Sequence, residues 1–399
     1  MARIFRWLLR LFTVVVVVAL LGVFLIYWLA SRSLPDYSAD HSVAGITAPV
    51  EIVRDNADVP HIFGATDADV FFGLGFAQAQ DRLWQMVMLR RTAQGRLSEI
   101  FGARTLPVDE LLRRLDLYNL AVKSVAAQDA ETLTALKAYA AGVNAWLGEV
   151  NKGALGRGAP ELFLFSNRIA PWQPADSIAI VKLMALQLSS HLDEEVLYAR
   201  TSLILPNERV RDIMPDAPGE GVAALPEYAA LFPGLPRYAE GAELPDDPLS
   251  PIRSRELAGA SNAWAAAPSR SATGSTLLAN DPHLGFTAPT IWYLARLELE
   301  TGGVIGGTIP GVPMVMLGRS EDFGWGLTSA YMDDQDLHIE KLNPDDDREV
   351  LTPDGYKKMT ERPSIIEIKD ATPITITLQW TENGPVLPGE MFDLATITP

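Results

Sequence analysis

The stretch LAGASNAWAAAPS, residues Leu257–Ser269, decides which fold the sequence predicts. It follows a segment dense in Pro, Asp and Glu, and it opens a run of residues that predicts a β-strand. A small Gly259-Ala260 pair leads directly into Ser261. Two interpretations are open. Either a linker ends here and a folded domain begins, or the chain is cut before Ser261 and this serine becomes an N-terminus.

Bulk composition limits the classes of function. The chain has 399 residues, enough for a large core or several domains. Its formal net charge of −17 argues against a nucleic-acid partner, because phosphates need clustered Lys and Arg. It has no cysteine, which excludes disulfides, thiolate catalysis and zinc–thiolate sites.

The N-terminus predicts a membrane segment. Residues 11–30, LFTVVVVVALLGVFLIYWLA, carry no charge and are long enough to span a bilayer as a helix. Arg3, Arg6 and Arg10 precede them, so the N-terminus is expected to stay in the cytoplasm. The alternative is a signal peptide cleaved near residues 31–33. Either way we expect an extracytoplasmic body, periplasmic and anchored in the inner membrane, or secreted if the segment is removed.

Sequence periodicity predicts a mainly helical first half and a β-rich second half, an α+β arrangement. Strands are expected at residues 50–55 and 60–64, followed by a helix with an N-cap at Thr66. Further helices are expected at about 107–125, 128–149 and 176–203. After Ser261 strands are expected at 262–268, 276–280, 291–300, 304–309, 314–317, 324–327, 337–342, 364–368 and 374–380.

Several common catalytic motifs are missing from the sequence. There is no G-x-S-x-G nucleophile elbow, no H-E-x-x-H, no Walker loop and no G-x-G-x-x-G after a strand. Five histidines are present, and their spacing favours no Ser-His-Asp triad.

A serine at a new N-terminus permits another chemistry, because it carries its own base. An α-amine has a pKa of about 7.7–8, so about a third of it is unprotonated at pH 7.5. Such an amine can activate a hydroxyl nucleophile. Liberation needs no protease if the Ser261 hydroxyl attacks the Ala260 carbonyl and water hydrolyses the resulting ester. Gly259 allows the strained backbone that this attack requires.

The sequence resembles the penicillin acylase family of N-terminal nucleophile (Ntn) hydrolases. Within that family it is most similar to members that resemble cephalosporin acylases and acyl-homoserine-lactone acylases. The run AQDRLWQM and the start SNAW are the most specific marks. The resemblance is carried by residues 53–102, 171–200, 259–284, 310–344 and 382–387.

That resemblance implies a four-layer αββα sandwich and a precursor that cuts itself between Ala260 and Ser261. Residues 1–33 would be the anchor or signal segment and 34–235 the helical α-chain part. Residues 236–260 would be the spacer, and 261–399 the N-terminal portion of the β chain. The processed α and β chains would stay associated. The family's β chain continues past the equivalent of Pro399, so we expect a C-terminally incomplete sandwich that lacks the second oxyanion donor.

The resemblance also implies the catalytic residues. Ser261 matches the nucleophile, and His283 matches a position that lies against it and orients its hydroxyl and amine. The segment LTSAYMDDQD, residues 327–336, is expected to supply a backbone N–H of the oxyanion hole, from Ser329 or Ala330. Histidine rather than glutamine at 283 favours a substrate other than penicillin G.

A structural calcium ion is implied at the acidic cluster of residues 333–336, and no organic cofactor. Carboxylate and carbonyl oxygens are the ligands that calcium prefers, although the spacing alone favours a solvated acidic loop. The matching ligands are Glu195, Asp333, the backbone oxygen of Gln335, and Asp336.

Apolar side chains are expected to line an acyl pocket, although core packing accounts for them equally well. They are Met184, Leu188, Leu284 and Leu317. The expected function is hydrolysis of small N-acyl amides such as β-lactams or acyl-homoserine lactones. The alternative is a membrane-anchored binding or structural protein of the same fold that has lost catalysis.

Overall fold

The computed structural model describes residues 2–152, 158–165, 169–189, 195–197, 201, 205–206, 209–210, 212, 261–284, 287–329, 336–338 and 340–392. The helices are α1 (Ala2–Ser31), α2 (Asp67–Ala93), α3 (Ser98–Phe101), α4 (Leu106–Arg114), α5 (Leu117–Val125), α6 (Ala130–Lys152) and α7 (Pro174–Ser189). Short 3-10 turns are η1 (Gly102–Thr105), η2 (Pro160–Phe163), η4 (Pro268–Arg270) and η5 (Gly389–Phe392). The strands are β1 (Glu51–Arg54), β2 (Pro60–Phe63), β3 (Ser261–Ala266), β4 (Leu277–Pro282), β5 (Tyr293–Leu299), β6 (Gly302–Thr308), β7 (Val315–Arg319), β8 (Gly324–Trp325), β9 (Leu342–Asn343), β10 (Asp346–Thr352), β11 (Gly355–Lys358), β12 (Thr360–Ile366), β13 (Ile374–Thr381) and β14 (Gly384–Pro385).

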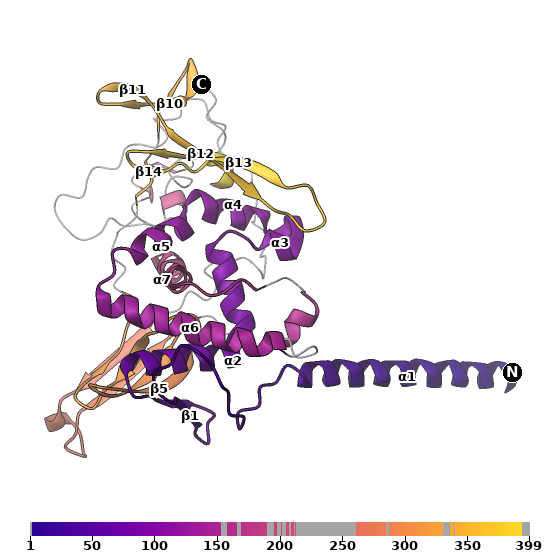
Figure 1. Ribbon diagram of the computed structural model, residues 1–399. Helices are drawn as coiled ribbons and strands as arrows, with labels where there is room; N and C mark the ends of the chain where they lie inside the picture. The colour runs from indigo at the N-terminus through magenta and orange to yellow at the C-terminus, as the bar shows by residue number, and fades with distance from the viewer. Residues whose placement is uncertain are drawn as a thin grey trace. The chain divides into compact units, whose positions relative to one another are not determined.

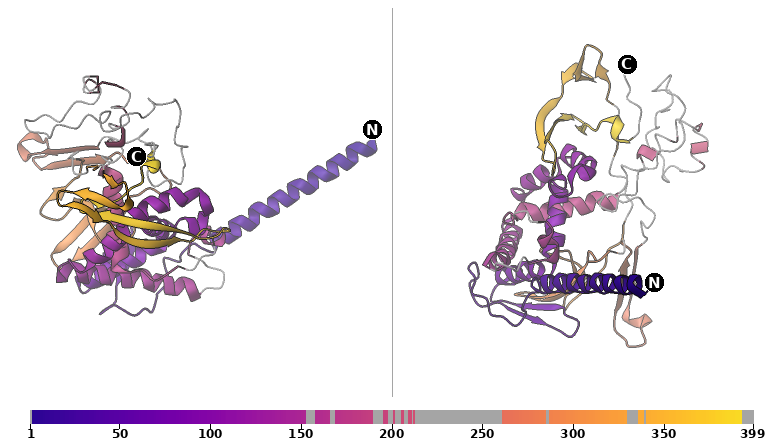
Figure 2. Two further views of the ribbon diagram at one scale, coloured as in Figure 1. Left: turned by 90° about the horizontal axis from the view of Figure 1, so that it is seen from above. Right: turned by 90° about the vertical axis from the view of Figure 1, so that its right-hand side faces the viewer.

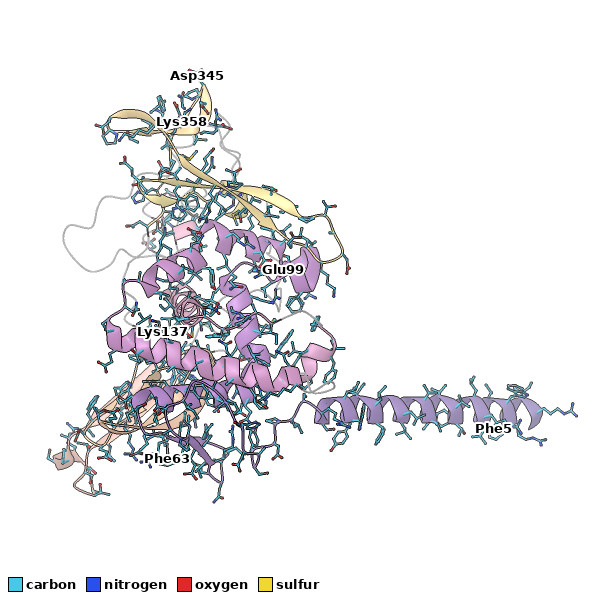
Figure 3. The ribbon with its side chains drawn as sticks, viewed as in Figure 1. Phe5, Phe63, Glu99, Lys137, Asp345 and Lys358 are labelled. Carbon is cyan, nitrogen blue, oxygen red and sulfur yellow. The ribbon has the colours of Figure 1, made fainter. Side chains whose placement is uncertain are left out.

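Helix α1 is long and apolar enough to cross a membrane. Its candidate span is Arg3–Ser31, with a mean hydropathy of 2.8 and none of the span buried within the protein. Figure 3 shows side chains, including that of Phe5, pointing outward all along this helix. The length and position are those of an anchor and equally those of an N-terminal signal segment.

Helices and strands are both abundant, which confirms the α+β class. The described helices of four turns or more end before Ser261, and the strands other than β1 and β2 follow it. The predicted N-cap is present, since Thr66 Oγ1 accepts a hydrogen bond from the Asp69 backbone N–H at 3.2 Å. The four-layer sandwich stays a prediction. So do the boundaries at 33, 235 and 260, the last two of which fall in a part of the chain outside the described ranges.

The chain divides into two compact units. The first comprises Met1–Arg90, Ala121–Ile180 and Ser261–Leu327. Its main sheet has the strand order β1-β2-β5-β6-β7-β8. Strand β2 pairs in parallel with β5, with His61 opposite Arg296. Segments that precede and follow Ser261 therefore share one sheet.

Helices α2 and α6 pack closely in the first unit (Figure 1). A Cβ on Gly75 would lie 2.2 Å from the Tyr139 carbonyl oxygen, and one on Gly142 would lie 1.9 Å from the Phe72 carbonyl oxygen. Only glycine lets the two backbones approach so far. A Cβ on Gly73 would likewise lie 2.5 Å from Ile62 Cγ2, so α2 packs directly on β2.

The second unit comprises Arg91–Leu120, Val181–Ala260 and Thr328–Pro399. It contains two three-stranded sheets, β11-β10-β9 and β12-β13-β14. Asp109 is fully buried there and accepts the backbone N–H groups of Leu97 and Ser98 at 2.8 and 2.6 Å. Burial raises the pKa of the Asp109 carboxyl despite these bonds. Arg113 donates to Ser364 Oγ at 3.0 Å and so joins α4 to β12.

The predicted helix at 107–125 is divided in two by Asp116. This residue has a φ of 56°, the left-handed region, which ends α4 at Arg114 and allows α5 to start at Leu117. The Asp116 carboxylate accepts a hydrogen bond from the Arg362 guanidinium and another from Asn119 Nδ2 at 2.7 Å. These tertiary contacts stabilise a break that helical periodicity alone does not show.

The β10–β11 hairpin was not predicted, and the strand expected at 337–342 was too long. Only Leu342 and Asn343 form β9. Figure 3 labels Asp345 just before β10 and Lys358 at the end of β11. The turn between these strands contains Pro353-Asp354-Gly355, with Gly355 at a φ of 104°. A Pro-Asp-Gly sequence is a turn signal that could have indicated this hairpin.

Candidate active site around Ser261

Ser261 is the first residue of β3 and is partly buried. β3 pairs with β4 as an antiparallel hairpin, with Ser261 opposite Pro282 and Asn262 opposite Asp281. The right-hand view of Figure 2 shows the hairpin and the short turn η4 at its tip. The strand predicted at 262–268 is therefore present but starts one residue earlier, at Ser261, and ends at Ala266, while Ala260 lies outside the described residues.

His283 directly follows β4 and is paired with a carboxylate. Its Nε2 donates to Asp281 Oδ2 at 2.7 Å, and both side chains are about half exposed. This hydrogen bond, and a second one from the Asn262 side chain, hold the pKa of the Asp281 carboxyl below its usual range. An ionised carboxylate fixes the direction of the imidazole, so Asp281 is a candidate orienter of His283.

Asn280 joins three backbone groups. Its Nδ2 donates to the Asn262 carbonyl at 2.8 Å and to the Leu327 carbonyl at 3.0 Å. Its Oδ1 accepts the Leu327 N–H at 3.0 Å. The side chain thus links β3 to the residue that follows β8 by two positions.

Two adjoining hollows lie beside the Ser261 end of this hairpin. One has a volume of about 470 Å³ and is lined by Leu284 among others. The other, of about 640 Å³, is lined by Leu317 among others. Both volumes fall in the range of small-molecule sites. Pro282, Thr290 and Trp292 line both hollows.

The second hollow has a polar wall centred on Asp81. The Asp81 carboxylate accepts the hydroxyls of Tyr37 and Tyr293 at 2.8 and 2.7 Å. It also pairs with the Arg54 guanidinium, whose Nη1 lies 2.9 Å from Oδ2. Burial and the Asp81 charge raise the pKa of Tyr37 to about 12 and that of Tyr293 well above its usual value. Both phenols are therefore neutral donors at physiological pH.

The remaining predicted pocket and oxyanion residues belong to the second unit. Met184 and Leu188 lie on α7, Met184 buried and Leu188 about half exposed, and neither lines the two hollows. Ser329 is exposed, and Ala330 lies outside the described residues.

Two of the four predicted calcium ligands are described. Glu195 is partly buried and Asp336 is exposed, while Asp333 and Gln335 lie outside the described residues. Within the ranges that the structure describes, no group of three or more His, Cys, Asp or Glu side chains is close enough to hold a metal ion. The calcium site stays a prediction.

Comparison with known proteins decides the family. The family model described as penicillin amidase matches residues 49–398. The chain belongs to the penicillin amidase family. It is 32% identical over 381 residues to penicillin acylase 2 proenzyme of Pseudomonas sp. strain SE83, covering 92% of this chain and 47% of the relative.

Other members of the penicillin amidase family show similar sequence identity and coverage. The acyl-homoserine lactone acylase QuiP of Pseudomonas aeruginosa is 31% identical, over 90% of this chain and 43% of the relative. The penicillin G acylase of Escherichia coli is 27% identical, and the match covers 90% of this chain and 47% of the relative. The chain thus spans about half the length of the curated relatives it matches. A solved thermostable penicillin G acylase from Alcaligenes faecalis is 27% identical, covers 45% of this chain and 98% of that chain, and has a TM-score of 0.36.

Sequence reasoning missed several residues of this candidate site. Asp81 lies in the AQDRLWQM run that marks the family, yet no role was predicted for it. Asp281 could have been found, because residues two apart in an extended segment point to the same face and this one precedes His283 by two. The local sequence around Asn280 did not indicate its role, because its hydrogen-bond partner Leu327 is 47 residues away.

Proposed function

We propose that the protein is an extracytoplasmic hydrolase of N-acyl amides that activates itself by cutting between Ala260 and Ser261. The observation that carries the proposal is the position of Ser261: it opens β3 opposite Pro282, one of the three residues that line both hollows. Because Ser261 pairs with Pro282, the serine lies at the end of the hairpin that borders these hollows, and their volumes suit a small substrate.

Self-cleavage proceeds by an acyl shift. The Ser261 Oγ attacks the Ala260 carbonyl carbon, the peptide C–N bond breaks, and the nitrogen leaves as the α-amine of Ser261. Water then hydrolyses the new ester, which releases the Ala260 carboxyl group and regenerates the hydroxyl. The new amine has a pKa of about 7.7–8 in an ordinary environment, so it serves as a base near neutral pH.

Substrate hydrolysis uses the same serine. The α-amine accepts the Ser261 hydroxyl proton while Oγ attacks the acyl carbonyl, and the proton then passes to the departing amine. Water hydrolyses the acyl-enzyme ester and releases the acid. The backbone N–H of Ser329 or Ala330 would stabilise the oxyanion, and such a donor is worth about 3–4 kcal/mol. His283, held by Asp281, orients the serine hydroxyl and amine.

The acyl group would occupy the hollows that Leu284 and Leu317 line. The apolar side chains on one side of these hollows suit an aliphatic or aryl acyl chain. Relatives named as penicillin acylases and acyl-homoserine lactone acylases support β-lactams and acyl-homoserine lactones as the substrates to try.

The two chains produced by the cut would stay associated. β2 pairs with β5 across the cut site, and buried Gln78 donates to Thr308 Oγ1 at 2.8 Å. Calcium bound by Glu195, Asp333, the Gln335 carbonyl and Asp336 would add a structural link. Calcium titration, followed by the thermal midpoint of wild type and of Asp336→Asn, tests that site: only the wild type should gain stability.

Denaturing electrophoresis with N-terminal sequencing tests the proposal. The expected result is two chains, one of which begins Ser-Asn-Ala-Trp, and a single uncut chain for Ser261→Ala. The matched control is Ser275→Ala, which removes an exposed hydroxyl beyond β3. A wild-type chain that stays intact and releases no acid from any N-acyl amide contradicts the proposal. It would favour a binding protein of the same family.

A further inference from the structure

We infer that Asn280 is a positioning residue that fastens the hairpin bearing Ser261 to the edge of the six-stranded sheet. The kinetic part of this inference rests on the proposed self-cleavage. The structural part rests on three hydrogen bonds and on two glycines that side chains of β4 approach closely, all within the first unit.

The Asn280 amide occupies the place of a strand residue beside Leu327. It donates to the Leu327 carbonyl and accepts the Leu327 N–H, both at 3.0 Å. A residue in a neighbouring antiparallel strand exchanges the same two bonds. The second amide hydrogen reaches the Asn262 carbonyl on β3 at 2.8 Å. One side chain therefore acts as a hydrogen-bonding link between the two sheets.

Such a link is needed because β3 and β4 form a sheet of only two strands. An isolated hairpin is marginally stable, and it needs further strands or packing for a fixed position. The six-stranded sheet ends at β8, and Leu327 follows that strand directly after Gly326. Asn280 thus connects the hairpin to the sheet at its exposed edge.

Two glycines make room for this connection. A Cβ on Gly326 would lie 2.8 Å from Asn280 Cγ and 2.9 Å from Asn280 Oδ1. A Cβ on Gly324 would lie 2.8 Å from Leu278 Cδ2, on the same strand as Asn280. Any larger residue at 326 would force the amide away from Leu327.

The register of the hairpin then sets the position of Ser261. Asn280 lies opposite Ala263, and two residues further along β4 Pro282 lies opposite Ser261. If the link is lost, the hairpin can shift against the hollows that Pro282 lines. A displacement of about 1 Å at a reacting group can cost about 100-fold in rate.

The test compares the rate of self-cleavage in the full chain carrying Asn280→Asp, Asn280→Ala and Gly326→Ala with wild type. Asn151→Asp is the matched control, because Asn151 is exposed at the end of α6. We expect the three variants near Asn280 to be about 100-fold slower in self-cleavage and the control to be unchanged.

In Asn280→Asp an ionised carboxylate faces the Asn262 and Leu327 carbonyls without a proton to donate. Its deficit relative to wild type should therefore shrink below about pH 4, where the new carboxyl is neutral and donates one bond.

Hydrogen exchange of the same proteins separates this inference from the proposed function. Asn280→Ala should speed exchange in the Leu327 amide and in residues 261–266, whether or not the chain cuts itself. If wild type stays uncut but exchange changes as expected, self-cleavage fails and the positioning role stands. If wild type is cut while Asn280→Asp and Asn280→Ala behave like the control in rate and exchange, the positioning role is wrong.

Discussion

Tyr293 donates its hydroxyl to Asp81 at 2.7 Å, although 212 residues separate the two in the sequence. Tyr293 lies after Ser261 and Asp81 before it, so the bond would join the two chains of a processed protein. The same carboxylate accepts Tyr37 and pairs with Arg54. Asp81 is thus the centre of a polar cluster that joins distant parts of the first unit and forms one wall of the second hollow.

Asp81→Asn should strongly destabilise the protein. The Arg54 and Asp81 side chains are only 11% and 12% exposed, so the substitution leaves a mostly buried guanidinium without its counter-charge. Breaking a buried pair in this way costs about 3–5 kcal/mol. Denaturant unfolding measures the change. The control is Asp212→Asn, which removes an exposed partner of Arg209 and should cost less than about 1 kcal/mol. Equal effects of the two variants would contradict the role of Asp81.

Tyr37 should make the protein lose stability at alkaline pH. Its pKa is about 12 in the folded protein, against an ordinary value of 10.0. Between these two values the unfolded chain has released the proton and the folded protein has kept it, so the free energy of unfolding falls as the pH rises. Thermal midpoints from pH 9 to 12 should fall less steeply for Tyr37→Phe than for wild type. Parallel curves would show that the phenol does not titrate in this way.

Asp281→Asn should reduce hydrolysis without unfolding the protein. The substitution removes the carboxylate that accepts the His283 proton at 2.7 Å and so frees the imidazole to turn. Because the imidazole then loses the charged acceptor that fixes its direction, a fall of about tenfold in kcat/KM is expected. Asp345→Asn, in the turn before β10 (Figure 3), is the control and should keep wild-type activity. Equal activity in both variants would show that His283 needs no carboxylate.

The parts predicted well from sequence have local causes. The Thr66 cap, the alternation of β1 and β2 and the start of β3 at Ser261 depend on residues within a few positions of one another. Of the predicted pocket residues, Leu284 and Leu317 each line a hollow, whereas Met184 and Leu188 line neither. Their contact with an acyl group stays a prediction.

The parts that were missed depend on distant partners. The break at Asp116 is stabilised by Arg362, 246 residues away, and the polar wall of the second hollow joins Asp81 to Tyr293. Periodicity and motif spacing carry no information about such pairs. Asn280 is the clearest case, because its amide completes a hydrogen-bond pattern that only the folded sheet edge defines.

The two glycines of α6 should respond in opposite directions to substitution by alanine. A Cβ on Gly142 would lie 1.9 Å from the Phe72 carbonyl oxygen of α2, whereas a Cβ on Gly148 would have nothing within 4 Å. Gly142→Ala therefore forces two buried helices apart, and overpacking of this kind costs about 1–3 kcal/mol. Gly148→Ala only reduces the freedom of the unfolded chain and should gain about 0.5–1 kcal/mol. Thermal and denaturant unfolding of both variants measure this difference. A stable Gly142→Ala protein would mean that α2 and α6 do not approach through these glycines.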